Sequence, residues 1–287
     1  MNTVSAAVSQ AAATLADAGV ASPLFDAQLL AAHALGCDRM ELFLRSQDPM
    51  PEEYQELISR RAARVPLQHI TGTAPMGHLD LAVGPGVFIP RPETELLGDW
   101  AVRWLRKQPA SNDNRPKVLD LCTGSGALAL YVATLVPQAE VTAVELDEVA
   151  AEWTRKNIAR YAPDVELVLA DASAPDVLVG RSFDVVITNP PYVPSVAEVS
   201  PEVQQDPYHA VFSGESGMDF ISAVAPNIVR WLNDGGAVGI EHDDSTATAV
   251  QDVLAKTAAF SQIKSHKDLA GRDRFVTAIR CATLRTE

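Results

Sequence analysis

From Lys117 onward the sequence alternates short apolar runs with longer stretches of helical periodicity, and this alternation constrains the fold more than any other feature. Continuous apolar strands separated by amphipathic helices are typical of a parallel sheet covered by helices on both faces. The expected strands lie at 117–121, 140–146, 165–170, 183–188, 236–241, 260–266 and 274–282. Because only a short connection joins the last two runs, we expect them to form an antiparallel edge. The sequence therefore predicts an α/β fold.

The first 71 residues are predicted to form a separate bundle of helices. Gly19 and Gly36 follow two stretches rich in Ala and Leu, where a glycine commonly ends a helix. Ser22 and Pro23 form a typical helix start, and a further helix is expected from Pro51. The bundle has no catalytic constellation, so it either stabilises the chain or docks a partner, and docking is the interpretation we favour.

Residues 72–90 differ from both neighbouring segments, since glycine and proline alternate there with short runs of β type. We predict a β-hairpin linker over this range, with its turn at Gly84-Pro85-Gly86 and strands that include 79–83 and 87–89. A helix and a polar loop at 109–116 are expected next. They belong to a third predicted segment, 91–287, which contains the sheet.

The net charge of −14 and the pI near 4.8 argue against a protein that grips nucleic acid through its phosphates. Cys37, Cys122 and Cys281 have no CxxC spacing, so neither disulfides nor a structural zinc site is expected, and no metal is predicted. The sequence has no run of about 18 apolar residues and no signal-peptide pattern, which indicates a cytoplasmic protein. The oligomeric state stays open, although we favour a monomer.

Two glycines, Gly124 and Gly126, lie between the first strand of the predicted sheet and the helix after it. Ligands bind such sheets at the carboxyl ends of the strands, where glycine lets the backbone turn sharply and approach a ligand. The next strand ends at Glu145, whose carboxylate suits the two hydroxyls of a ribose. Asp171 and the backbone at Ala172 follow the third strand and are candidates for holding an adenine edge. The pattern fits NAD as well as S-adenosylmethionine, and a tight turn without a ligand is the third alternative.

The tetrapeptide Asn189-Pro190-Pro191-Tyr192 directly follows the apolar run 183–188. A planar amide or aromatic amine carries two hydrogens, and the side-chain oxygen of Asn189 and the carbonyl of Pro190 are two acceptors suited to them. Proline stiffens the loop and has no competing N–H, and Tyr192 offers a flat face for stacking. Such a site favours methyl transfer to a planar nitrogen, which predicts S-adenosylmethionine as cofactor and Asn189, Pro190 and Tyr192 as catalytic residues. A rigid turn without function is the alternative.

Several segments can be compared with known families. They are FIPRPETELL (88–97), DLCTGSGALAL (120–130), NPPYVP (189–194), SGESGMDF (213–220) and DLAGRDRFV (268–276). Together they closely resemble the HemK/PrmC family of release factor glutamine methyltransferases, and the resemblance extends from the N-terminal helices to the end of the chain. NPPY is shared with many amino methyltransferases, whereas PRPETE together with DLAGRDR is more specific.

The resemblance implies a five-helix N-terminal domain, a hairpin linker and a seven-stranded, Rossmann-like class I methyltransferase sheet. It also implies methyl transfer from S-adenosylmethionine to the side-chain amide nitrogen of the glutamine in the Gly-Gly-Gln loop of peptide chain release factors. Substrate contacts would fall on Asn189, Pro190, Pro191 and Tyr192. Pattern and resemblance together give these expected cofactor contacts: Cys122, Thr123, Gly124, Ser125, Gly126, Glu145, Asp171, Ala172, Asn189, Phe88 and Arg91. Pro92 and Glu93 would help to wall the site, and Arg91 and Glu93 are equally suited to a structural ion pair.

Three positions depart from the family pattern. Cys122 stands where glycine is frequent, Glu145 stands where aspartate is usual, and Glu-His-Asp-Asp at 241–244 replaces Glu-Ile-Gly. No second His or Cys lies at ligand spacing from His242, so we expect a solvated strand end there and not a metal ligand.

Three other functions are weighed against this one. A ribosomal-protein glutamine methyltransferase would share the catalytic core. A DNA or RNA amino methyltransferase would need a basic groove, and direct nucleic-acid binding is not expected here. A binding module without activity would have no need of the intact NPPY.

Overall fold

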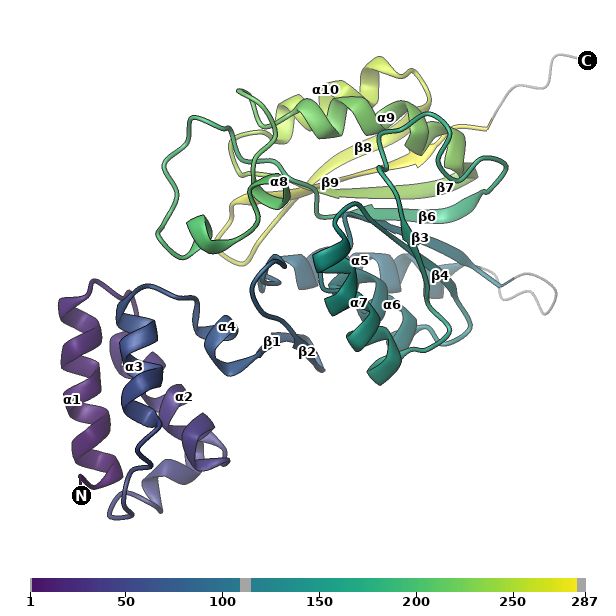
Figure 1. Ribbon diagram of the computed structural model, residues 1–287. Coiled ribbons are helices and arrows are strands. Elements are labelled where there is room, and N and C mark those ends of the chain that lie inside the picture. Colours follow the sequence, from purple (N-terminus) through teal and green to yellow (C-terminus); the bar gives the residue numbers. More distant parts are fainter. Residues whose placement is uncertain (1, 109–114, 283–287) are drawn as a thin grey trace, which may run out of the picture. The chain divides into compact units, whose positions relative to one another are not determined.

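The computed structural model describes residues 2–108 and 115–282, so the polar loop expected at 109–116 lies largely outside the described residues (Figure 1). The chain forms two compact units. The first comprises the residues up to Thr73 together with Val199–Gln205, and the second comprises the remainder. Within the described residues, no helix is both long enough and apolar enough to cross a membrane.

The first unit is a bundle of short helices around an apolar core that includes Leu15 and Leu30. Its elements are α1 (Val4–Asp17), α2 (Pro23–Leu35), the 3-10 helix η1 (Arg39–Phe43), α3 (Tyr54–Ala62) and α4 (Leu67–Thr71). Helix α2 begins at Pro23 and ends before Gly36, whose φ of 59° is left-handed, as the sequence predicts. The helix expected from Pro51 begins only at Tyr54.

A cluster of charges ties Val199–Gln205 into the first unit. The carboxylate of Glu202 accepts from Nε and Nη2 of Arg64, both at 2.7 Å, and forms an ion pair with Nη1 of Arg61 at 2.9 Å. Arg61 also pairs with Asp26 at 2.7 Å, and both of these side chains are buried. The last residues of the segment form the 3-10 helix η2 (Val203–Gln205).

The second unit contains a seven-stranded sheet in the order β5-β4-β3-β6-β7-β9-β8. Its strands are β3 (Lys117–Leu121), β4 (Glu140–Glu145), β5 (Glu166–Leu169), β6 (Phe183–Thr188), β7 (Leu232–Glu241), β8 (Phe260–Lys267) and β9 (Asp273–Arg280). The five strands from β3 to β7 pair in parallel, whereas β9 pairs antiparallel with both β7 and β8. The predicted Rossmann-like sheet and its antiparallel edge are confirmed.

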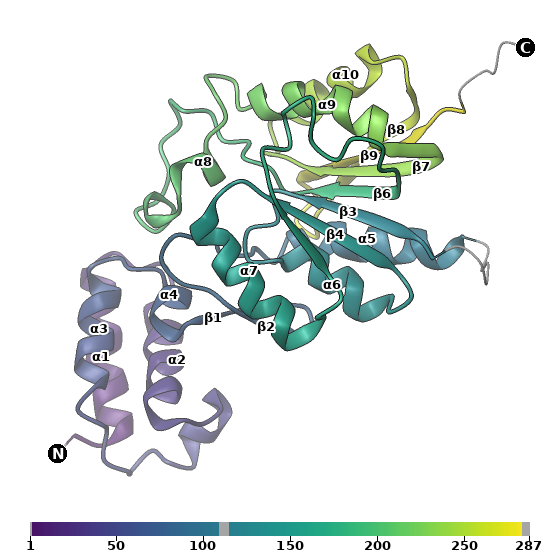
Figure 2. The ribbon, with the colours of Figure 1, turned by 45° about the vertical axis from the view of Figure 1, so that its right-hand side comes forward.

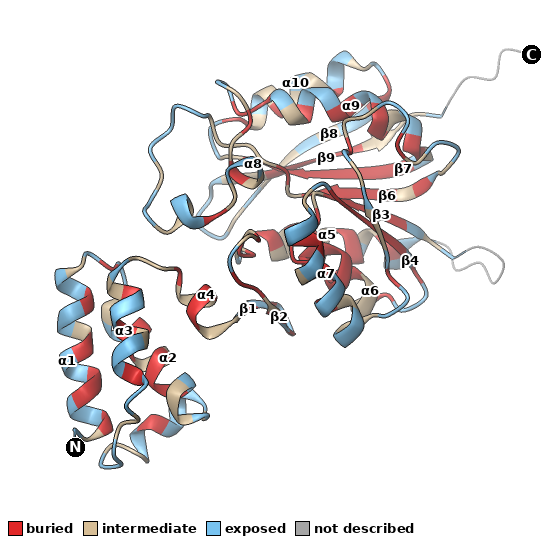
Figure 3. Cartoon of the chain, in the orientation of Figure 1, coloured by how far each residue is buried: buried red, intermediate tan, exposed pale blue. Residues whose placement is uncertain are grey.

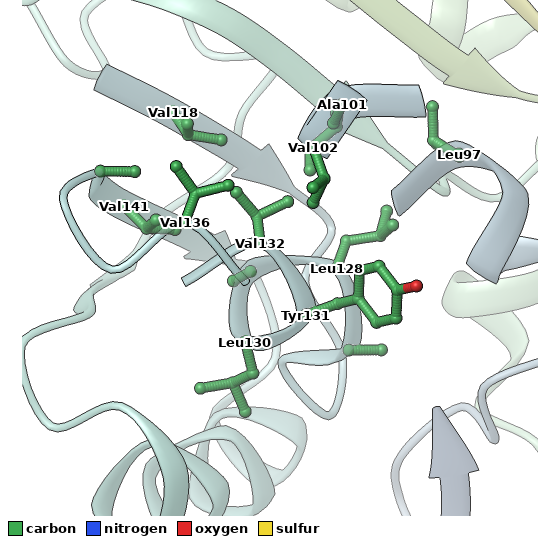
Figure 4. Close-up of a cluster of buried hydrophobic side chains, with 14 of the residues drawn as sticks. Leu97, Ala101, Val102, Val118, Leu128, Leu130, Tyr131, Val132, Val136 and Val141 are labelled. Atoms are coloured by element: carbon green, nitrogen blue, oxygen red, sulfur yellow. The ribbon is translucent and has the colours of Figure 1, made fainter. Parts of the chain in front are cut away.

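Helices cover both faces of this sheet (Figures 1 and 2). On one face lie α5 (Thr94–Lys107), α6 (Ala127–Leu135) and α7 (Glu148–Tyr161), and on the other lie α9 (Asp219–Trp231) and α10 (Ala247–Lys256). Leu97 and Val102 of α5, Val132 of α6, and Val118 and Val141 of the sheet belong to the first of the two cores, which Figure 4 shows in close-up. Figure 3 shows that the central strands are buried along most of their length, as continuous apolar runs predict.

The hairpin is formed by β1 (Thr73–Met76) and β2 (Leu79–Ala82), so its turn lies at Gly77-His78 and the prediction of a turn at 84–86 is wrong. A β-carbon at Gly77 would lie 2.4 Å from the Tyr131 ring, and the φ of 58° is left-handed, which explains the glycine. A β-carbon at Gly84 would lie 2.5 Å from Trp153 of α7. Gly84 and Gly86 therefore permit close packing on α7. Residues 87–89 form no strand.

Candidate active site

The loops that carry the predicted site begin at one level of the sheet. The register pairs are Val144 with Leu121, Leu121 with Thr188, and Thr188 with Ile240. The next residues of four neighbouring strands, Glu145, Cys122, Asn189 and Glu241, therefore stand in a row at the carboxyl edge. The strand order reverses between β3 and β6, and this switch point is where ligands bind in open α/β sheets. The structure thus brings the glycine turn and the NPPY loop together.

The glycine turn begins with a residue in an unusual conformation. Cys122 has φ 55°, a left-handed value that costs a non-glycine residue about 1–2 kcal/mol. Burial raises the pKa of its thiol, and the Glu145 carboxylate raises it further. Gly124 and Gly126 are also left-handed, but only at Gly124 would a β-carbon meet no atom within 4 Å. At Gly126 it would lie 3.1 Å from Leu130, so Gly124 is the one that leaves room for a ligand.

Buried side chains hold the turn in place from both ends. Asp120, at the end of β3, accepts hydrogen bonds from the Thr123 hydroxyl at 2.6 Å and the Ala129 N–H at 3.0 Å. Burial raises the pKa of Asp120 to about 7, although these two bonds lower it. From α7, the Thr154 hydroxyl donates to the Gly124 carbonyl at 2.5 Å and Asn157 Nδ2 donates to the Ser125 carbonyl at 2.9 Å. These supports were not predicted from the sequence, although Asp120 belongs to the DLCTGSGALAL segment.

Glu145 is buried and already accepts three hydrogen bonds from backbone N–H groups. Gly124 donates to Oε2 at 2.8 Å, and Leu146 and Asp147 donate to Oε1, each at 2.9 Å. A carboxylate offers about four acceptor positions, so about one remains for a ligand. Glu145 therefore links the glycine turn at 122–126 to the backbone that follows β4 at Leu146 and Asp147. Its role as a ribose clamp stays a prediction.

The predicted adenine contacts lie after β5. Asp171 is exposed, and its Oδ1 accepts from the N–H and the hydroxyl of Ser173 at 2.8 and 2.7 Å. Ala172 is buried, and its carbonyl accepts from Asn227 Nδ2 at 2.8 Å. Hydrogen bonds with Ser173 and Asn227 thus hold the chain at Asp171 and Ala172 in place. The contact of these two residues with a cofactor stays a prediction.

Two oxygens of the NPPY loop accept no hydrogen bond from the part of the chain that the structure describes. Asn189 Nδ2 donates to Thr94 Oγ1 at 3.2 Å, which leaves the amide oxygen on the other side. Within the described residues, neither Asn189 Oδ1 nor the Pro190 carbonyl accepts a hydrogen bond. The Tyr192 hydroxyl faces Glu241 Oε1 at 3.4 Å, and burial raises the pKa of this tyrosine. The acceptor pair that the sequence predicts is therefore free to bind a ligand.

Residues 211–217 brace the NPPY loop from behind. Val193 N–H donates to the Val211 carbonyl at 2.9 Å, and Ser195 N–H donates to the Gly214 carbonyl at 2.8 Å. A β-carbon at Gly217 would lie 2.1 Å from the Tyr192 carbonyl oxygen, so only glycine fits there. The SGESGMDF segment thus supports the loop that carries the acceptors. Next to it in the chain is α8 (Tyr208–Val211).

Arg91 forms its ion pair with Asp206, at 3.1 Å, and not with Glu93. Its guanidinium also lies over the Phe88 ring, 5.2 Å from the centroid. Burial raises the pKa of Asp206 to about 6, although Arg91 lowers it. This contact fixes the side chain of Arg91, and the cofactor roles expected for Arg91 and Phe88 stay predictions.

His242 is fully buried, so the expectation of a solvated strand end is wrong. Its Nδ1 lies 2.8 Å from the Asp243 carbonyl, and burial lowers the pKa of the imidazole. The ring is enclosed because β9 pairs with the end of β7, and His242 N–H donates to the Arg274 carbonyl at 2.9 Å. Across the described residues, no group of three or more His, Cys, Asp or Glu could hold a metal ion.

Comparison with known families matches both parts of the chain. The family model described as the PrmC N-terminal domain matches residues 6–72, and the one described as the methyltransferase small domain matches residues 99–206. The second match contains the glycine turn and the NPPY loop.

Curated relatives match over nearly the whole length. A release factor glutamine methyltransferase of Corynebacterium glutamicum is 52% identical, covering 97% of this chain and 99% of the relative. The proteins of the same name from Mycolicibacterium smegmatis and Deinococcus radiodurans are 47% and 39% identical, covering 98% and 95% of this chain. Among solved structures, a methyltransferase from Pyrococcus furiosus has a TM-score of 0.53 at 18% identity and covers 81% of this chain and 100% of its own, which supports the fold.

Proposed function

The chain belongs to the family of release factor glutamine methyltransferases, and we propose that it methylates the side-chain amide nitrogen of the glutamine in the Gly-Gly-Gln loop of a release factor. The observation that carries the proposal is the pair of free acceptors, Asn189 Oδ1 and the Pro190 carbonyl, at the switch point of the sheet. A carboxamide nitrogen has two hydrogens to donate to such a pair.

We propose S-adenosylmethionine as the methyl donor. The residues fit it, since the turn leaves open space at Gly124 and Glu145 keeps about one acceptor position for a ribose hydroxyl. The turn at 122–126, Glu145, and the backbone at Ala172 would hold the cofactor, which supplies an activated methyl group when bound. Phe88 and Arg91 would close the site beside them.

The chain's own contribution is to bind and orient the acceptor nitrogen. Asn189 and Pro190 would accept its two hydrogens and place the amide in one plane, and Tyr192 would stack on that plane. Acceptors that pull on the N–H bonds raise the electron density on nitrogen as it attacks. Positioning of this kind contributes up to about 7–11 kcal/mol to a displacement. One N–H proton would leave to water only after the new N–C bond has formed, so a strong base is not required.

We assign docking of the release factor to the helical unit of residues 1–71. Three apolar side chains in and directly after η1 are strongly exposed, Phe43 at 84%, Leu44 at 82% and Met40 at 78%. An apolar cluster on a small unit suits a protein partner. The net charge of −14 suits a partner that is basic in places, and such a reaction belongs in the cytoplasm.

The proposal is tested by mass spectrometry of purified release factor after incubation with the protein and methyl-labelled S-adenosylmethionine. We expect one added methyl group on the glutamine of the Gly-Gly-Gln loop, and none when that glutamine is replaced by Ala. Ribosomal proteins are incubated in parallel. Label on a ribosomal glutamine with none on release factor would overturn the proposed substrate.

A further inference from the structure

We propose that His209 is a positioning residue that holds residues 206–213, which we call the clasp, against the chain at 145–147 and thereby slows release of the bound cofactor. The inference rests on the proposed function, because it takes the ligand held at Glu145 to be S-adenosylmethionine. It gives a role to a segment that the proposed reaction leaves without one.

Both ends of the clasp are held by segments that the proposed reaction uses. At its start, Asp206 forms an ion pair at 3.1 Å with Arg91, an expected cofactor contact, and the Asp206 side chain is fully buried. At its end, Val193 N–H donates to the Val211 carbonyl and Ser213 N–H donates to the Val193 carbonyl, both at 2.9 Å. Val193 directly follows the NPPY loop, so the clasp is joined to the residues that would hold the substrate amide.

Between these ends, His209 joins α8 to the residues that follow β4. Its Nε2 lies 3.1 Å from Oδ2 of Asp147. The other oxygen of Asp147 caps α7 by accepting from the N–H groups of Val149 and Ala150, at 2.6 and 3.3 Å. The Asp147 N–H also donates to Glu145 Oε1 at 2.9 Å. Asp147 is therefore already ordered when His209 reaches it, and the contact connects the clasp with the proposed ribose clamp.

The contact between His209 and Asp147 is suited to opening and closing. The two side chains are 45% and 26% exposed, and a pair that solvent reaches contributes little to the stability of a fold. Tyr208, beside His209, is itself 64% exposed, and its ring stacks on Phe212 with 4.7 Å between the centroids. Segments that must open for a ligand to enter and leave belong to the less stable parts of a structure. Loss of the contact should therefore change cofactor release while the fold is kept.

The first test measures the rate constant for dissociation of the demethylated cofactor, by stopped-flow displacement. We expect this rate constant to rise about two- to fivefold in His209→Ala, as the loss of a partly exposed pair implies. His209→Gln, which keeps an N–H donor, should restore most of the effect. His78→Ala is the matched control, because His78 is an exposed imidazole that contacts Thr134 Oγ1 at 3.0 Å outside the clasp, and it should change nothing. Equal rate constants in His209→Ala and the unchanged protein would overturn the inference.

A double-mutant cycle tests whether His209 acts through Asp147. Asp147→Ser keeps a side-chain oxygen that can cap α7 but removes the second oxygen that faces His209. It should speed dissociation of the demethylated cofactor, and adding His209→Ala to it should cause no further increase. Effects of the two substitutions that multiply would overturn the inference.

A third readout needs neither cofactor nor turnover. Chymotrypsin cleaves after aromatic residues, and the bond after Tyr208 lies inside the clasp. Cleavage at this bond should be faster in Asp147→Ser, which leaves the cleaved sequence unchanged, than in the unchanged protein, and equal cleavage rates would overturn the inference. If the variants behave as expected but no methyl group reaches release factor, the proposed function fails while the clasp stands. If release factor is methylated but the demethylated cofactor leaves all variants at one rate, only the clasp fails.

Discussion

Replacing Glu145 with Gln would test how the carboxyl end of β4 controls the cofactor turn. The carboxylate accepts from Gly124 N–H on one oxygen and from Leu146 and Asp147 N–H on the other. A carboxamide has only one acceptor oxygen. If that oxygen serves Leu146 and Asp147, its NH2 group faces the Gly124 N–H, and the opposite orientation loses two bonds instead of one.

The expected magnitude follows from that lost bond. A hydrogen bond to a charged group contributes about 1.5–3 kcal/mol, and about 1.4 kcal/mol corresponds to tenfold in binding. Because the Gly124 bond holds the turn that would approach the cofactor, we expect Glu145→Gln to weaken the binding of S-adenosylmethionine about 10- to 100-fold.

Isothermal titration calorimetry with S-adenosylmethionine and with its demethylated product measures this directly. Glu140→Gln, at the opposite and exposed end of the same strand, is the matched control and should leave both Kd values unchanged. A Kd within about threefold of the unchanged protein for Glu145→Gln would refute both the bond's contribution and the assignment of Glu145 to the cofactor site.

Four further predictions concern the rest of the chain. Asn189→Ala should lower kcat by about 100-fold or more, with an unchanged cofactor Kd, because it removes one of two amide acceptors; near-normal turnover would contradict its role. Gly217→Ala should lower kcat through displacement of the NPPY loop, since its β-carbon would lie 2.1 Å from the Tyr192 carbonyl oxygen, and normal single-turnover rates would count against this. Phe43→Ser with Leu44→Ser should raise the release-factor KM without changing the cofactor Kd, and an unchanged KM would argue against docking at η1. Burial would raise the pKa of Glu202, but hydrogen bonds from Arg64 and Arg61 lower it to about 2, so its contribution to stability is complete above about pH 4.5 and is lost as the pH falls toward 2. Calorimetry of Glu202→Gln should therefore show a lower Tm than the unchanged protein at pH 7 and a smaller difference at pH 3, and equal Tm values at pH 7 would refute the ion pair's contribution.

The sheet could be predicted because its signal is local. Most residues of the central parallel strands β3, β4 and β6 are apolar and buried, and the loops at 122–126 and 189–192 follow two strands that flank the switch point. The place of Asn189 and Pro190 directly after β6 could likewise be read from chain order, while their role as acceptors for a substrate amide stays a prediction.

The supporting side chains could not be predicted in the same way. Thr94 lies 95 positions from Asn189, and only the fold brings them together. The hairpin turn was misplaced because a glycine needed for packing on Trp153 and a glycine needed for a turn look alike in sequence. His242 was misjudged for a related reason, since its burial depends on the pairing of β9 with the end of β7.

The most direct measurement is a crystal structure with the demethylated cofactor and a peptide that carries the Gly-Gly-Gln loop. We expect the glutamine nitrogen within hydrogen-bond distance of both Asn189 Oδ1 and the Pro190 carbonyl, with the cofactor sulfur in line behind it. A glutamine bound elsewhere, or residues 189–192 turned away from the sulfur, would contradict it.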